Sequence, residues 1–325
     1  MRPSCILALC YATVLTFVTA PVVGEHVWRD GQWVEAAPPA EGTPAGELAL
    51  IRQYLSEDEP DDAADAAEEF LEDYPADPRC EEAMILWAQA ERADGDFYDA
   101  FERYEAYLEA YPNGRYVERA LRREYDIGVA FLEGRPRKAL GIFRLPGAPD
   151  GVEILEKLVA RAPRSHASAD ALVKLADYWI SEGKHARAVQ TCDQYLELFS
   201  DAPQTPDMML KAARATYRAF QGVPHDPTPL LEAEQRFAVF IERYPERAEK
   251  AGAKEVLDEI RRLRAAKLME TAEFYRRVDR PESAIYYCHR VLERYPSTPS
   301  ADEARAALKA LGAPVESASE ENESQ

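Results

Sequence analysis

The sequence predicts an all-helical fold, a right-handed superhelix of about six antiparallel helix pairs. Six amphipathic stretches end on an aromatic-proline step or a close variant of one: Tyr74-Pro75, Tyr111-Pro112, Ala162-Pro163, Phe199-Ser200, Tyr244-Pro245 and Tyr295-Pro296. A small residue lies twelve positions before the end of each step: Ala63, Ala100, Gly151, Ala188, Ala233 and Ala284. Small residues let two helices approach closely, and proline ends the second helix of a pair. Their recurrence indicates a repeated structural unit.

Two units show the pattern best. Residues 81–112 place Ala88 in a first helix, Gly95 in the turn and Ala100 in a second helix. Residues 265–296 carry equivalent positions, with Asp279 in the turn. This arrangement resembles the tetratricopeptide repeat, in which small residues at fixed positions and a closing proline define a helix pair. Large residues nearby are expected to fill the space against the next pair: Trp87, Tyr104 and Tyr107 in one unit, and Phe274, Tyr275 and Tyr287 in the other.

The helix pairs are expected in order along the chain. The predicted ranges are 47–75, 77–112, 115–133 with 150–162, 165–200, 207–244, and 247–278 with a helix closing at Pro296, followed by a last helix over 299–311. Insertions are expected at 135–149 and 222–228, the first of them carrying Leu140, Ile142, Phe143 and Leu145. Residues 313–325 contain four glutamates and no large apolar residue beyond Val315, so disorder is expected there.

The charge balance excludes one class of partner. The net charge is -20, and between Glu41 and Glu82 fifteen acidic residues face only two arginines, Arg52 and Arg79. These acids form either a solvated helix face or an acidic surface that repels phosphates. In both cases nucleic-acid binding is not expected for this protein.

The first twenty residues are typical of an export signal. A short positive start, Met1-Arg2, precedes fourteen mostly apolar residues from Cys5 to Val18. This run is too short for a comfortable membrane span and suits a cleaved signal peptide, residues 1–20. Cleavage is expected after Ala20, with Gly24 as the second choice. Cys10 lies inside the apolar run after the bulky Leu9, so the mature protein is expected to carry no lipid there.

Residues 21–46 combine a short hairpin with a linker rich in proline and alanine. The step Asp30-Gly31 lies between two apolar arms, which is a two-residue hairpin signal, and it would place Trp28 opposite Trp33. The ribbon could cover the apolar edge of the first helix pair. Alternatively, Trp28 and Trp33 anchor the mature N-terminus to a partner or a membrane surface.

No catalytic, cofactor or metal site is predicted. The five histidines are scattered, and the sequence contains no glycine-rich phosphate loop, nucleophile elbow or paired-cysteine motif. Cys192 and Cys288 occupy the same repeat position, four residues after the small alanine, which suits a small apolar core residue. We therefore expect a protein that is not an enzyme and requires no cofactor.

Residues 149–312 resemble the outer-membrane protein assembly factor BamD and its relatives. Three segments carry the resemblance: 188–219, 232–263 and 265–308. The last is the most specific, because it joins an AEFY step, a short polar turn and a helix that ends in RYP. Residues 47–148 look like further repeats of the same general type. The chain departs from the family in two ways, since it has six pairs where five are usual and no good match to the lipid-bearing cysteine.

The resemblance implies a function. It suggests a scaffold at the periplasmic face of the outer membrane, peripheral to that membrane, in the machinery that assembles β-barrel proteins. Its partners would be the barrel insertase, other subunits of the complex and unfolded client segments, the clients lying in a concave groove lined by first helices. The alternative is an exported repeat adaptor that coordinates cell-envelope or cell-division proteins.

An arginine-rich end is the candidate partner-binding site. Nine basic residues fall between Arg261 and Arg294, in contrast to the acidic first repeats. Arginine binds carboxylates with two hydrogen bonds and is enriched in protein interfaces. The candidate contact residues are Arg276, Arg277, Arg280, Arg290 and Arg294. The simpler interpretation is a solvated face with pairs four residues apart, such as Glu273 with Arg277.

Overall fold

The computed structural model describes residues 26–29, 32–35, 40–139, 143–220 and 227–315. The helices in these ranges are α1 (Pro44–Ser56), α2 (Pro60–Asp73), α3 (Cys80–Asp94), α4 (Phe97–Ala110), α5 (Val117–Leu132), α6 (Ala148–Arg161), α7 (His166–Ser181), α8 (His185–Leu198), α9 (Thr205–Arg218), α10 (Thr228–Arg243), α11 (Pro245–Lys250), α12 (Ala253–Arg277), α13 (Pro281–Arg294) and α14 (Pro299–Ala310).

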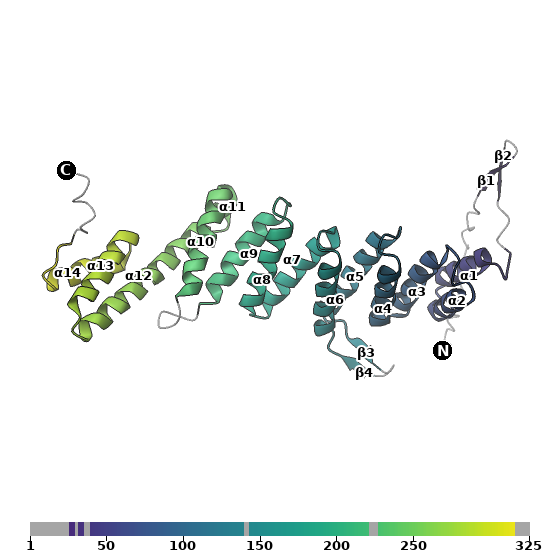
Figure 1. Cartoon of the computed structure of the whole chain (residues 1–325), viewed down its shortest axis with the longest axis horizontal. Coiled ribbons are helices and arrows are strands. Elements are labelled where there is room, and N and C mark those ends of the chain that lie inside the picture. Colours follow the sequence, from purple (N-terminus) through teal and green to yellow (C-terminus); the bar gives the residue numbers. More distant parts are fainter. Residues whose placement is uncertain (1–25, 30–31, 36–39, 140–142, 221–226, 316–325) are drawn as a thin grey trace, which may run out of the picture.

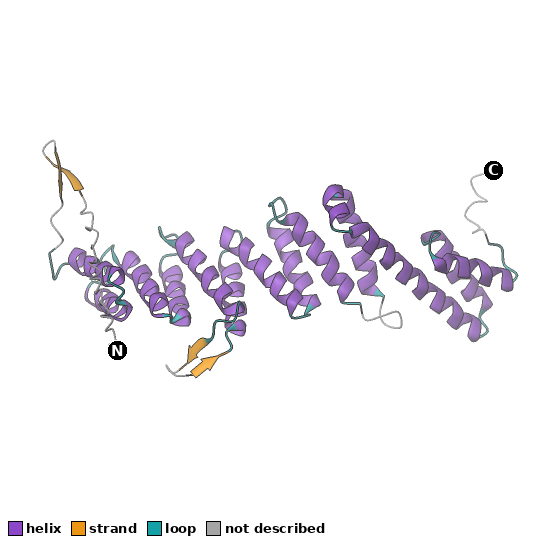
Figure 2. Ribbon diagram, turned by 180° about the vertical axis from the view of Figure 1, so that it is seen from behind, coloured by secondary structure: helices purple, strands orange, loops and turns teal. Residues whose placement is uncertain are grey.

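The helices form an elongated array in chain order, with α1 and α14 at opposite ends (Figure 1). Six antiparallel pairs make up this array: α1 with α2, α3 with α4, α5 with α6, α7 with α8, α9 with α10, and α12 with α13. The same succession is visible from behind, where strands occupy only two small ribbons at the margins (Figure 2). The predicted fold class, a helical superhelix of the tetratricopeptide type, is confirmed.

The small residues lie where the helices of a pair approach most closely. Five alanines at these positions are at most 1% exposed: Ala63, Ala100, Ala188, Ala233 and Ala284. The sixth position is Gly151, where an added Cβ would lie 2.7 Å from the carbonyl oxygen of Gly128 on α5. The repeated small residue therefore reflects backbone contact that a larger side chain would prevent.

The closing aromatic residue has a constant role. Tyr74, Tyr111, Phe199, Tyr244 and Tyr295 are each the C-cap of a second helix, as is Ala162. In four pairs its ring packs on the aromatic ring four residues earlier, with centroid separations from 5.3 Å to 5.9 Å. Residues four apart lie on one face of a helix, so the two rings close the end of the pair together.

In several pairs whose turns the structure describes, a left-handed residue lies in the turn. Gly95 and Gly183 have φ of 89° and 67°. In the sixth pair Asp279 occupies this position with a φ of 57°. Aspartate tolerates this conformation better than most residues, which explains why a non-glycine residue can replace the expected glycine.

The first helix of the sixth pair differs from the prediction. The sequence indicated one helix over 247–278, but the structure divides it into α11 and α12 at Gly252, whose φ is 65°. Helix α12 then continues for 25 residues. Its first half packs in one core through Leu257 and Ile260, and its second half packs in another through Ala265 and Met269. A single helix thus connects the fifth pair to the sixth.

The insertion at 135–149 contains a two-stranded ribbon to which the sequence analysis assigned no secondary structure. Strands β3 (Arg137–Ala139) and β4 (Phe143–Leu145) pair antiparallel. Lys138 forms ion pairs with Asp96 at 2.8 Å and with Asp94 at 3.3 Å. Arg137 binds Asp150 at 3.1 Å. These contacts tie the ribbon to the second and third helix pairs.

A carboxyl group is buried at the junction between these two pairs. Glu124 on α5 has 0% exposure, and its neighbour Glu105 on α4 binds Arg161 on α6 at 2.8 Å. Burial raises the pKa of Glu124 well above its ordinary value, and the nearby Glu105 adds to this increase. A protonated Glu124 can donate a hydrogen bond to the carboxylate of Glu105, which binds Arg161 together with the more distant Glu109 at 3.8 Å.

The N-terminal ribbon consists of β1 (His26–Arg29) and β2 (Gln32–Glu35). Its register places Trp28 directly opposite Trp33, as the Asp30-Gly31 step indicated. The ribbon stands away from α1 and α2 and does not cover the edge of the first pair (Figure 1). A role for the two tryptophans as an anchor stays a prediction.

The predictions for the signal peptide, Cys10 and residues 316–325 lie outside the described residues. Among the described helices, none has the length and apolar character needed to cross a membrane. Cys80, Cys192 and Cys288 are buried free thiols.

Candidate protein-binding surface

Four aromatic rings form a continuous row across the sixth helix pair. Phe274 contacts Tyr275 edge to face at a centroid distance of 5.4 Å. Tyr275 stacks on Tyr287 of α13 at 5.5 Å, and Tyr287 contacts Tyr286 at 5.3 Å. The row therefore begins on α12, passes between the two helices and ends on α13.

Both ends of this row are open to solvent. Phe274 is 51% exposed and Tyr286 is 55% exposed, and Val278, one turn beyond Phe274, is 48% exposed. The expectation that Phe274 fills the space against a following pair is wrong. Tyr104, on the second helix of the second pair, is fully buried and is followed by the third pair, whereas in the described chain only α14 follows α13.

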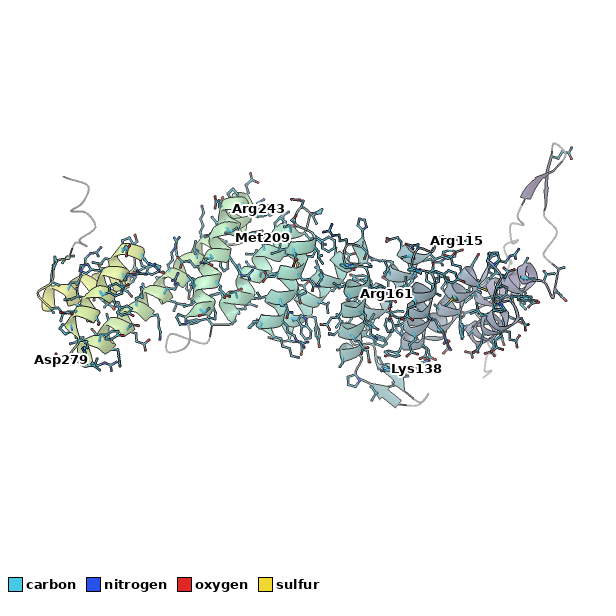
Figure 3. The ribbon with its side chains drawn as sticks, in the orientation of Figure 1. Arg115, Lys138, Arg161, Met209, Arg243 and Asp279 are labelled. Atoms are coloured by element: carbon cyan, nitrogen blue, oxygen red, sulfur yellow. The ribbon has the colours of Figure 1, made fainter. Side chains whose placement is uncertain are left out.

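Arginines flank the aromatic row. Arg277 lies three residues after Phe274 on α12. Arg280 follows Asp279 in the sequence, and Figure 3 labels Asp279 at the turn between α12 and α13. The side chains of both form no hydrogen bond or ion pair with any described residue. Arg290 lies one turn after Tyr286, with its guanidinium 5.8 Å from that ring and 3.4 Å from the phenol oxygen. We call the rings with Val278, Arg277, Arg280 and Arg290 the α12–α13 surface.

Arg276 differs from its neighbours because it is already paired. Its guanidinium binds Glu273 at 2.7 Å, three residues earlier on the same helix. This hydrogen bond lowers the pKa of the Glu273 carboxyl. The solvated-face interpretation paired Glu273 with Arg277, but the structure pairs it with Arg276. Arg276 is therefore less available to a partner than Arg277 or Arg280.

The predicted arginines do not form one patch. Arg276, Arg277 and Arg280 lie at the turn, whereas Arg294 lies at the other end of α13. A 14-residue helix spans about 21 Å, so Arg280 and Arg294 are separated by roughly that distance. Arg294 instead lines a crevice of about 600 Å³ with Arg261 and Arg262. The sequence analysis grouped these residues because they are close in the sequence, but the length of α13 places Arg294 at the end of the pair opposite the turn.

A carboxylate holds the crevice together. Glu234 on α10 accepts hydrogen bonds from Arg264 and from Arg261, the latter at 3.4 Å. The hydroxyl of Tyr295 also donates to Glu234 at 3.4 Å. Because Arg261 and Arg264 on α12 bind Glu234 on α10, their charges connect the fifth pair with the sixth. They serve the fold, and the sequence analysis did not identify them because the partners lie at least 27 residues apart.

The described residues contain no group of three or more histidine, cysteine or acidic side chains arranged to hold a metal ion. The surface chemistry of the sixth pair is that of protein contact, with exposed aromatic rings between guanidinium groups that form no ion pair with a described residue. The fold and this surface together define a repeat protein of the tetratricopeptide class.

The comparison with protein families identifies the group. Residues 149–320, more than half of the 325-residue chain, match the model of the family described as YfiO, outer membrane lipoprotein. The chain belongs to this family. The matched region includes both helices of the sixth pair and the whole α12–α13 surface. A search of functionally curated proteins gave no match.

Solved structures of repeat proteins are similar to the chain at low identity. A tetratricopeptide repeat protein from Parabacteroides merdae is 12% identical, with 83% of this chain and 98% of that chain covered and a TM-score of 0.35. The C-terminal part of a repeat protein from Cytophaga hutchinsonii is 17% identical, with 81% and 88% covered and a TM-score of 0.37. A Thermus thermophilus repeat protein is 19% identical, with 65% and 98% covered and a TM-score of 0.29. Because these scores are low, the fold class rests on the pairing and burial described above.

Proposed function

We propose that the protein is a non-enzymatic scaffold of the machinery that assembles β-barrel proteins in the outer membrane. It is exported, lies at the periplasmic face of that membrane and binds the barrel insertase. Membership of an outer membrane lipoprotein family supports the location. The observation that carries the proposal is the α12–α13 surface, which exposes Phe274 and Tyr286 between Arg277, Arg280 and Arg290.

The chemistry of this surface suits a specific protein contact. Aromatic and arginine side chains contribute much of the energy of protein interfaces, and aromatic rings bury a large area with little loss of conformational freedom. An unpaired guanidinium can hold a carboxylate with two hydrogen bonds. The insertase would therefore present an acidic and apolar surface, with its carboxylates on Arg277 and Arg280 and its apolar groups on the aromatic row.

The second candidate is an exported adaptor for cell-envelope or cell-division proteins. Such an adaptor would bind its partners through the earlier repeats, and the α12–α13 surface would have no part in recognition. The two functions therefore differ in which part of the array is required.

Affinity purification from a detergent-solubilised envelope separates the two functions. We expect the wild type to recover the barrel insertase and a variant with Arg277→Glu, Arg280→Glu and Arg290→Glu to lose it. The matched control reverses three other exposed arginines, Arg164, Arg218 and Arg243, and so changes the net charge equally. If the first variant recovers the insertase as well as the control does, the α12–α13 surface is not the binding site. Recovery of division proteins by all three forms would favour the adaptor.

Retention at the membrane follows from the same proposal. We propose that the mature protein carries no lipid on Cys10 and is held by protein contacts, with Trp28 and Trp33 as an additional anchor. Replacing both tryptophans with serine should increase the fraction released from envelope membranes by salt. An unchanged fraction would exclude the ribbon as an anchor.

A further inference from the structure

A groove far from the α12–α13 surface lies between the second helices of two successive pairs. It has a volume of about 290 Å³, with α6 as one wall and α8 as the other. Its floor is formed by Leu172, Leu175 and Trp179 of α7, which are 1%, 2% and 4% exposed. The floor is therefore a packed apolar layer of which little is exposed to solvent.

The α8 wall carries a row of polar side chains. Arg187, Gln190 and Gln194 line the groove and are all exposed. They lie three and four residues apart and therefore on one face of the helix. Thr191, also in this wall, already donates to the carbonyl oxygen of Arg187 at 2.9 Å. Within the described chain, the amides of Gln190 and Gln194 have no hydrogen-bond partner.

The spacing of these amides matches an extended peptide. Residues four apart on a helix are separated by about 6 Å along its axis. An extended chain repeats every two residues, over roughly 6.6 Å. Each glutamine amide can both donate and accept, so Gln190 and Gln194 can bond successive backbone groups on one side of a strand. Glu156 on the opposite wall is exposed and can accept from the other side.

The end of the groove near Trp179 is positively charged. The guanidinium of Arg187 lies 4.6 Å from the Trp179 ring, and the ammonium of Lys184 lies 5.2 Å from it. Neither cation has a carboxylate partner among the residues that the structure describes. A carboxylate placed here would meet two cations held against an aromatic face.

We propose that this groove binds an extended segment of a partner protein in which a large apolar residue is followed by an acidic residue. The apolar side chain lies on Leu175 and Trp179, and the acidic side chain binds Arg187. Gln190 and Gln194 bond the backbone of the segment. The proposal rests on the scaffold role above and adds a second binding site between second helices, whereas the sequence analysis expected a groove along the first helices.

The test uses a labelled peptide and fluorescence anisotropy. The α8 wall is 14 residues long and spans about 21 Å, which six to seven extended residues cover. The probe is a blocked peptide of about this length with one phenylalanine followed by aspartate in a glycine-serine background. Replacing both glutamines, Gln190→Ala with Gln194→Ala, should weaken binding by about tenfold or more. Arg187→Gln should remove the preference for aspartate over asparagine in the peptide.

Matched controls lie on neighbouring helices. Gln235→Ala on α10 and Arg218→Gln on α9 change exposed residues of the same types outside the groove and should leave binding unchanged. The proposal is overturned if the wild type does not bind the probe at millimolar peptide, or if the groove variants bind as the controls do. It is also overturned if a peptide that lacks aspartate but has a free C-terminal carboxylate binds equally well. The groove would then recognise the end of a chain and not an acidic side chain.

The peptide-binding experiment and the insertase purification test different surfaces, so either proposal can fail without the other. The variant with Arg277→Glu, Arg280→Glu and Arg290→Glu should bind the peptide as the wild type does, because these arginines are in the sixth pair. Loss of insertase binding with peptide binding retained would leave the groove proposal standing. The reverse result would leave the α12–α13 surface standing.

Discussion

Tyr275 on α12 stacks on Tyr287 on α13, with ring centroids 5.5 Å apart and planes 10° from parallel. The stack lies between the two helices and supports the exposed rings of Phe274 and Tyr286 on either side. The exposed rings are thus held in place by packed ones. A pre-organised aromatic row loses little conformational entropy when a partner binds, which is the property expected of an interface.

The first prediction separates binding from folding at this row. Tyr286→Ser removes a ring that is 55% exposed, so the melting temperature should change little. Tyr287→Ser removes a stacked ring, and aromatic pairs contribute about 0.5–1.5 kcal/mol, so it should lower the melting temperature. Both variants should weaken insertase binding in a pull-down. Full binding by Tyr286→Ser would contradict a role for the aromatic row.

The second prediction concerns the buried Glu124. Its pKa is raised in the folded protein, so its protonated form stabilises the fold below the ordinary glutamate pKa. That contribution is lost as the pH rises through the folded-state pKa. Glu124→Gln cannot ionise and keeps a donor toward Glu105. Relative to the wild type, the variant should therefore gain stability as the pH rises above the ordinary glutamate pKa.

Thermal unfolding at several pH values checks this difference. Glu118→Gln, an exposed position on the same helix, is the control and should run parallel to the wild type. A constant difference between Glu124→Gln and the wild type across the range would show that Glu124 does not titrate there. Arg161 and Lys157 on α6 also act on this carboxyl, and both favour its charged form.

The third prediction concerns the close approach of α5 and α6. In Gly151→Ala, the new Cβ would lie 2.7 Å from the carbonyl oxygen of Gly128 and 2.8 Å from the backbone nitrogen of Leu132. Backbone atoms cannot move aside as a flexible side chain can, so the helices must separate. Overpacking of this kind costs about 1–3 kcal/mol. Urea denaturation should show this loss, whereas Ala160→Ser, exposed on the same helix, should be nearly neutral.

The fourth prediction concerns export. Mass spectrometry of the protein purified from its native envelope should give a chain that begins after Ala20, without an acyl group. A mass that corresponds to an acylated N-terminal Cys10 would reject both the cleavage site and the absence of lipid. It would also give the protein a direct membrane anchor, so that Trp28 and Trp33 would not be needed for retention.

Local signals in the sequence determined the helix pairs. A small residue at the contact and an aromatic-proline step at the end of each pair act through backbone approach and helix termination, which depend on neighbours in the same unit. For this reason the pairs and their order could be predicted, with the ends of most helices correct within a few residues. The division at Gly252 was missed, because a left-handed glycine inside a long amphipathic pattern resembles a tolerated helical glycine.

The exposure of each face was decided by tertiary structure. Phe274 and Tyr104 were both expected to pack against a following pair, yet Phe274 is half exposed, whereas Tyr104, whose pair is followed by another pair, is buried. The candidate arginines were grouped because they are close in the sequence, but the length of α13 separates Arg280 from Arg294, and Arg276 pairs with Glu273 on its own helix. Glu124 and the groove between α6 and α8 likewise depend on neighbouring pairs. The sequence alone determined the repeating unit, whereas the surfaces available for binding depend on which residues of neighbouring units cover them.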